Sequence, residues 1–145
     1  MAAVLEQLNL VSRDIDATIG FYRLLGMKIS EKSVWRTTGG RHHVSVPFPN
    51  GFSLDFDSPA LARAYNKGYR GNTTGGNVVI GFGVKTRGLV DSTYLKLTKA
   101  GHKGLQLPWD AFWGSRYAIV ADPDGNPVGI MRPADPKKRS QAPSI

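Results

Sequence analysis

Polar and apolar residues alternate in several short runs of this chain, and turn residues bound each run. Leu8 and Leu10 alternate with Gln7 and Asn9, and a second alternating run spans residues 52 to 57. A period of two is typical of a strand with one buried face. In both runs the pattern places the apolar side chains toward a core and the polar ones on the opposite face.

Two other segments have the longer period of a helix. One starts at Asp14 or Asp16 as N-cap and ends at Gly26, and the other covers residues 89–100 and ends at Gly101. Acidic caps and terminal glycines are the usual start and stop signals of helices. The pattern therefore predicts one order of elements twice, a strand, a helix and three strands. The predicted strands are 5–11, 27–36, 41–48 and 52–57, then 77–84, 104–109, 116–121 and 127–131.

The two halves repeat at a constant spacing. Gly51 and Gly125 each precede a strand that ends at a proline, and they lie 74 positions apart. The helix ends repeat at nearly the same offset, so the sequence predicts a duplicated architecture. We expect a single domain over residues 1–133, with module one at about 4–59, a linker at about 60–76 and module two at about 77–133. Residues 134–145 are expected to be a basic, disordered tail.

The second half closes on Asp122-Pro-Asp-Gly-Asn126, a strong hairpin signal. Together with the two βαβββ modules and the Phe21-Tyr22 pair before the Leu25-Gly26 helix end, it resembles the vicinal oxygen chelate superfamily, which includes glyoxalase I, bleomycin-resistance proteins and extradiol dioxygenases. The stretch 108–120 is similar to the metal-free, mitomycin-binding resistance proteins. This resemblance implies an α+β fold with a curved mixed sheet around a cleft, and a homodimer.

The resemblance also identifies the positions at which metal-dependent members hold their ion. They correspond here to Gln7, Asp55, Val79 and Gly129. Val79 and Gly129 have no donor atoms in their side chains, and two remaining ligands bind a divalent ion weakly. We therefore expect neither a metal nor another cofactor.

Aromatic side chains are the second group of candidate binding residues in the expected cleft. They cluster near the stretch from Pro108 to Tyr117, and planar ligands bind to such rings by offset stacking. Of the neighbouring His42 and His43, strand alternation allows only one to face the cleft. The candidate ligand-binding residues are Gln7, Asn9, Trp35, His43, Phe48, Asp55, Trp109, Phe112, Trp113, Tyr117 and Met131.

Composition limits the function classes. The 145 residues include no cysteine, which excludes thiolate nucleophiles and disulfides, and the formal net charge of +8 favours neutral or anionic ligands. No signal-peptide pattern or membrane-length apolar run is visible, so we expect a soluble, cytoplasmic protein.

These features predict a metal-free protein of the antibiotic-resistance type that sequesters a planar organic molecule. One alternative is an enzyme of the same superfamily, lyase-like or dioxygenase-like, with a non-standard or relocated metal site. The other is nonspecific nucleic-acid binding, which the basic charge favours although no motif for specific recognition is present. No membrane partner is expected.

Overall fold

Two units, residues 1–73 and 74–145, each have their own sheet in the computed structural model of this chain. The structure describes residues 5–65, 69–71 and 78–142. No helix within these ranges is long and apolar enough to cross a membrane.

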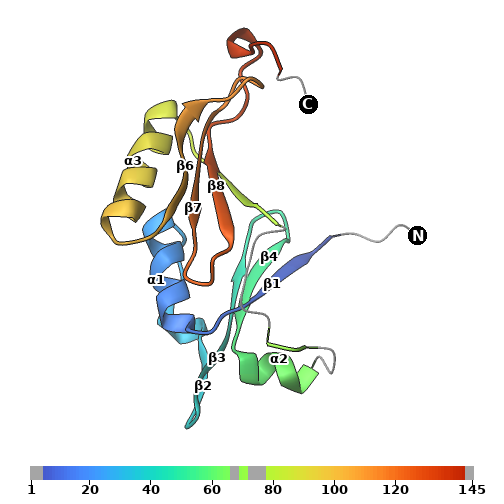
Figure 1. Cartoon of the computed structure of the whole chain (residues 1–145). Coiled ribbons are helices and arrows are strands. Elements are labelled where there is room, and N and C mark those ends of the chain that lie inside the picture. Colours follow the sequence, from blue (N-terminus) through green and yellow to red (C-terminus); the bar gives the residue numbers. More distant parts are fainter. Residues whose placement is uncertain (1–4, 66–68, 72–77, 143–145) are drawn as a thin grey trace, which may run out of the picture. The chain divides into compact units, whose positions relative to one another are not determined.

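The first unit consists of a strand, a helix and three strands, followed by a short helix (Figure 1). Its sheet has the order β1-β4-β3-β2, in which β1 and β4 are parallel and the other pairs antiparallel. The elements are β1 (Gln7–Val11), α1 (Ile15–Leu25), η1 (Glu31–Ser33), β2 (Trp35–Thr37), β3 (Gly40–Pro47), β4 (Ser53–Asp57) and α2 (Pro59–Tyr65).

Helix α1 covers the apolar face of this sheet. Its N-cap is Asp14, whose carboxylate accepts a hydrogen bond from the backbone of Ala17, and its last turn closes on Gly26 in a left-handed conformation. Tyr22 stacks on Phe56 of β4 with ring centroids 4.8 Å apart, and both side chains are fully buried. The core of the unit therefore lies between α1 and the alternate, apolar positions of β3 and β4.

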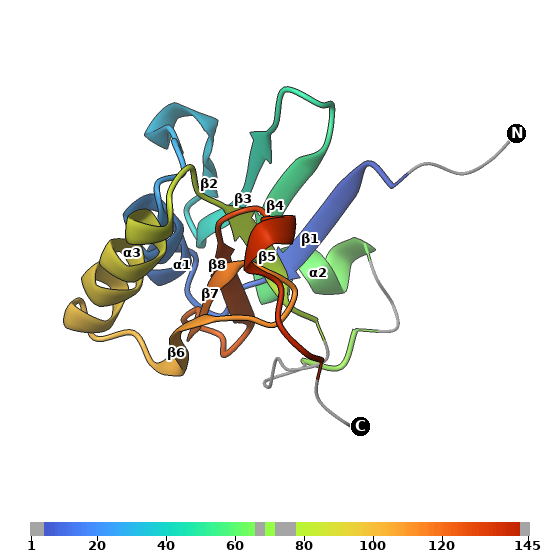
Figure 2. The same cartoon turned by 90° about the horizontal axis from the view of Figure 1, so that it is seen from above.

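Helix α2 lies on the other side of the sheet from α1 (Figures 1 and 2). Ser58 starts it, because its side chain accepts from the backbone of Leu61 and its carbonyl accepts from that of Ala62. Ala62 is buried. The first residues of the predicted linker are thus helical, while 66–68 and 72–76 of that linker lie outside the described residues.

The second unit repeats the arrangement with the strand order β5-β8-β7-β6. Helix α3 starts at the N-cap Thr86 and buries Val90, Tyr94 and Leu97. The hairpin between β7 and β8 is held by Asp122, whose carboxylate accepts from the backbones of Asp124 and Asn126. The elements are β5 (Ile80–Gly83), α3 (Arg87–Lys99), β6 (Gly104–Asp110), β7 (Arg116–Ala121), β8 (Pro127–Met131) and η2 (Pro136–Lys138).

The predicted α+β fold of tandem βαβββ modules is confirmed, with a separate four-stranded mixed sheet in each module. The predicted strand 27–36 is wrong over most of its length, since only its last two residues belong to a strand, β2, and residues 31–33 form η1. The guanidinium of Arg23 binds the carbonyl of Ile29, and Ser30 caps η1 by accepting from the backbone of Lys32. These local hydrogen bonds replace the sheet ladder there.

The chain after β8 also differs from the predicted disordered tail, as far as residue 142 is described. Asp135 caps η2, and its backbone N–H donates to the carbonyl of Gly114 at 3.2 Å. Further on, the N–H of Ser140 donates to the carbonyl of Phe112 at 2.9 Å. Residues 135–140 are thus fastened to the loop between β6 and β7.

Gly114 is required at this contact for two reasons. Its φ is 95°, and a Cβ would collide with the carbonyl oxygen of Asp135. We expect Gly114→Ala to lower the free energy of unfolding by more than the roughly 1–2 kcal/mol that a left-handed backbone alone costs an L-residue. Urea unfolding measures it, with Gly26→Ala as the matched control, because Gly26 has a φ of 113° but open space around it. Equal losses in the two variants would contradict the proposed contact.

Candidate functional site

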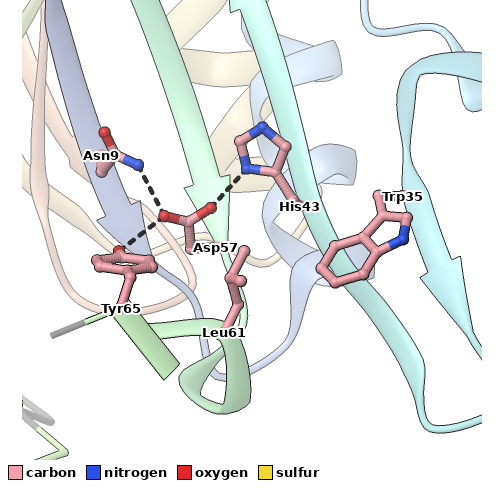
Figure 3. A pocket seen from close by; sticks show the side chains of 6 residues that line it. All are labelled: Asn9, Trp35, His43, Asp57, Leu61 and Tyr65. Atoms are coloured by element: carbon pink, nitrogen blue, oxygen red, sulfur yellow. Dashed lines mark hydrogen bonds and ion pairs between the residues drawn. The ribbon is translucent and has the colours of Figure 1, made fainter. Parts of the chain in front are cut away.

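A pocket of about 370 Å³ opens on the polar face of the first sheet (Figure 3). It lies between the sheet and α2, and its lining comes from five elements. The lining residues are Asn9, Trp35, His43, Asp57, Leu61 and Tyr65. The volume is within the range of small-molecule sites, which begins at about 300 Å³.

Asp57 lies at the base of the pocket and is 1% exposed. Its Oδ2 accepts from Asn9 Nδ2 at 2.7 Å and from the hydroxyl of Tyr65 at 2.8 Å, while Oδ1 lies 2.6 Å from Nδ1 of His43. Figure 3 shows the three side chains converging on the carboxylate from β1, β3 and α2. A buried carboxylate requires such partners, because it has lost its hydration.

The hydrogen bonds of Asp57 limit which of its neighbours' atoms can donate and which can accept. An ionised carboxylate only accepts, so Nδ1 of His43 donates when Asp57 is ionised, and in a neutral ring with its proton on Nδ1 the other nitrogen, Nε2, is an acceptor. Tyr65 donates in the same way. Loss of solvent around its hydroxyl, followed by the hydrogen bond to Asp57, raises the pKa of Tyr65 to about 12. The phenol therefore remains a donor throughout the physiological pH range.

The two adjacent histidines point to different surroundings, as alternation requires. His43 lines the pocket, whereas His42 lies 2.7 Å from the hydroxyl of Thr37 and 3.0 Å from that of Ser58. Trp35 is the cross-strand partner of His43 and is 51% exposed, so its indole contributes a solvent-accessible apolar wall.

A second buried carboxylate lies on the same face of the sheet. Asp55 is 4% exposed and accepts from Nε2 of Gln7 at 2.5 Å and from the hydroxyl of Ser45 at 2.7 Å. Gln7 and Asp55 were both predicted to face the cleft, and the structure brings them together. Both donors to this carboxylate come from neighbouring strands, so Asp55 links β1, β3 and β4 on the polar face of the sheet.

The corresponding face of the second sheet has a different chemistry. Tyr117 of β7 lies over Gly129 of β8, and a Cβ at Gly129 would be 2.7 Å from the tyrosine hydroxyl oxygen. Met131 lies beside Gly81 in a similar way, because a Cβ at Gly81 would be 3.5 Å from the methyl carbon of Met131. Loss of solvent raises the pKa of the Tyr117 phenol. Large side chains thus fill the space that the glycines leave open.

Trp113 is the centre of an aromatic cluster in this unit. Its ring meets those of Trp109, Phe112 and Tyr117 at centroid distances of 5.6, 5.0 and 5.6 Å, all edge to face. Trp109 is 36% exposed and the other three rings are half-buried. The four predicted aromatic candidates are therefore brought together, and much of their surface is used in contacts with one another.

The predicted site residues of the first unit lie in three different places. Asn9, Trp35 and His43 meet in the pocket, Gln7 and Asp55 lie on the same sheet face, and Phe48 packs near Phe52 with ring centroids 6.4 Å apart. Phe48 does not line the described pocket.

Three residues of the pocket were not among the predicted candidates. Asp57 was placed on the correct face by alternation, while Leu61 and Tyr65 fell in the predicted linker. The signal for α2 was nevertheless present, because Ser58 followed by Pro59 is a typical N-cap and N1 pair before a run of helix formers.

The residues do not fit the metal centre that the predicted family implies. Of the four corresponding positions, Val79 and Gly129 lack donor side chains, and Gln7 uses its amide nitrogen on Asp55. Within residues 5–65, 69–71 and 78–142, no three His, Cys, Asp or Glu side chains are grouped closely enough to hold an ion.

Comparisons with known proteins agree with this architecture. The sequence model described as "Glyoxalase/Bleomycin resistance protein/Dioxygenase superfamily" matches residues 4–130. A glyoxalase/bleomycin resistance protein/dioxygenase family enzyme from Burkholderia phytofirmans PsJN superposes with a TM-score of 0.74 at 21% identity, covering 90% of this chain and 98% of that one.

Two further solved structures are similar. A glyoxalase-related enzyme from Fulvimarina pelagi has a TM-score of 0.74 at 22% identity, covering 90% of this chain and 88% of its own. The hypothetical protein SA1046 from S. aureus has 0.71 at 23% identity, covering 91% and 94%. At such identities the likeness concerns the fold alone. No curated protein matches the sequence.

Replacing Tyr65 by phenylalanine tests the hydrogen bond to Asp57 through pH. A phenol titrates near pH 10 in an unfolded chain, and the folded pKa of about 12 favours the protonated form. Tyr65 therefore contributes stability that is complete below about pH 10 and is lost as the pH rises toward about 12. We expect the stability difference between wild type and Tyr65→Phe to shrink over that interval in urea unfolding. A pH-independent difference for Tyr65→Phe would contradict the assignment.

The Tyr117–Gly129 contact is tested by a double-mutant cycle. Gly129→Ala is expected to lower the free energy of unfolding by about 1–3 kcal/mol, because the ring of Tyr117 must move. In the Tyr117→Ala background the same substitution should cost clearly less. An unchanged cost in that background would show that the ring does not occupy this space.

Proposed function

This chain belongs to the glyoxalase/bleomycin resistance protein/dioxygenase superfamily, and we propose that it is a non-covalent binder of a small planar organic molecule. The ligand-binding site in this proposal is the pocket of the first unit. Many antibiotics are compounds of this kind. Binding to the protein would lower the free concentration of such a compound.

One observation supports this proposal, namely that the pocket combines an exposed indole with a hydrogen-bonded polar base. Trp35 offers a flat apolar surface, its cross-strand partner His43 offers a ring nitrogen, and Asn9 lies on the far side of Asp57 (Figure 3). A cavity of about 150 Å³ is known to hold a benzene ring. The 370 Å³ here is therefore sufficient for a ligand of one or two rings.

The choice of binding over metal-dependent turnover rests on the donor set. At Gly129 the space that a ligating side chain requires is taken by Tyr117, and Val79 is apolar. The superfamily supports both enzymes and resistance proteins on one fold, so the fold does not decide between them. The residues present favour recognition by stacking and hydrogen bonds.

Titration of the intrinsic tryptophan fluorescence with a panel of planar antibiotics and other polycyclic compounds tests the proposal, with calorimetry for the affinities. For a compound that binds, we expect Trp35→Ala to weaken binding by about tenfold or more, because stacking and buried area are both lost. Trp113→Ala is the matched comparison in the second unit.

Three results of that experiment would contradict the proposal. One is a panel in which no compound binds. Another is unchanged binding in Trp35→Ala combined with weaker binding in Trp113→Ala, which would move the site to the aromatic cluster. The third is a stoichiometric metal in the purified protein whose removal abolishes turnover of a substrate, which would favour the enzymatic alternative.

A further inference from the structure

We propose that His43 accepts a proton from the ligand, so that the pocket selects aromatic compounds with an acidic hydroxyl, such as phenols and enols, and holds them as anions. This inference rests on the proposed function, since it names the chemical class of ligand for the same pocket. It adds a proton transfer that binding alone does not require.

The orientation of the imidazole ring is the first support. Nδ1 of His43 lies 2.6 Å from a carboxylate that is 1% exposed, whereas the histidine side chain itself is 33% exposed. Figure 3 shows the ring on the pocket wall between Asp57 and Trp35, with its other nitrogen directed away from Asp57. No described residue is hydrogen-bonded to that nitrogen, so Nε2 is open to a ligand and can accept when Nδ1 carries the proton of the neutral ring.

The other polar groups of the pocket are unsuited to this role. The oxygens of Asp57 already accept three hydrogen bonds, and Tyr65 is held as a donor. Asn9 does not titrate. Of the described lining residues, the other titratable ones are Asp57 on β4, which contacts His43, and Tyr65 on α2, which contacts Asp57, while β2 contributes the uncharged Trp35. Histidine is the side chain that exchanges protons near neutral pH, which leaves His43 as the acceptor.

The proton transfer is balanced within the complex. The O–H bond of the ligand breaks, a new N–H bond forms at Nε2, and the electron pair remains on the ligand oxygen. The resulting imidazolium lies between the ligand anion and the carboxylate of Asp57, so its positive charge has a partner on each side. Asp57 acts here as a positioning residue, because it holds the tautomer and compensates the charge.

Two probes that share a nitrobenzene ring separate this idea from simple stacking. 4-Nitrophenol has an acidic hydroxyl and a distinct absorption band when ionised, and 4-nitroanisole carries a methyl ether in its place. At a pH where free nitrophenol is mostly neutral, we expect the complex with the wild-type protein to show the nitrophenolate band. Nitrophenol should bind about tenfold or more tightly than nitroanisole, as expected for a charge-assisted hydrogen bond.

His43→Gln is the decisive variant. The histidine side chain is partly exposed, so the protein should tolerate the change, and the glutamine amide can still form hydrogen bonds but does not take up a proton near neutral pH. It should still bind both probes, now with similar affinity and without the nitrophenolate band. His102→Gln, which removes a histidine of the second unit, should behave as the wild type. Asp57→Asn should weaken the band, and far-UV circular dichroism establishes whether this variant folds.

The outcomes distinguish the two proposals. Bound nitrophenol that stays neutral in the wild type, or an undiminished nitrophenolate band in His43→Gln, would overturn the proton transfer while leaving the pocket as an aromatic binding site. If neither probe binds at millimolar concentration while the planar panel also fails, the binding function falls and this inference with it. Binding of panel compounds without any preference for acidic hydroxyls would overturn the inference alone.

Discussion

The buried carboxylate of Asp57 is the constraint on which the pocket depends. A charge that has left water must find donors within the protein, and Asp57 takes them from β1, β3 and α2. The same three hydrogen bonds that compensate this charge also fasten α2 to the sheet and fix the imidazole of His43. Local stability and the geometry of the candidate site therefore have a common origin.

The two modules share an architecture but have diverged in chemistry. In both, the parallel partner of the first strand, β4 or β8, presents alternate residues to one face, and in both a glycine turn precedes that strand. The first module uses this face for Asp55 and Asp57, whereas the second has Gly129 and Met131 there. Buried carboxylates are thus found on this face of the first unit, and the cluster of aromatic rings lies in the second.

This asymmetry bears on the role of the chain within its superfamily. The fold is common to proteins with metal centres and to resistance proteins, so activity depends on the side chains that each member places on its sheets. Here the residues at the corresponding positions are an amide, a carboxylate, an apolar side chain and a glycine, namely Gln7, Asp55, Val79 and Gly129. Such a set favours hydrogen bonding and stacking over coordination.

The sequence by itself determined the features that depend on neighbours along the chain. Alternation assigned Asn9 and Asp57 to one face, and the capping signals placed the start of α1 at Asp14 or Asp16 and its end at Gly26, because periodicity and capping act over a few residues. The tertiary structure alone decided what those faces meet. The contact of Tyr65 with Asp57, the ring of Tyr117 over Gly129 and the attachment of residues 135–140 to the Phe112 loop join segments whose approach no local pattern encodes.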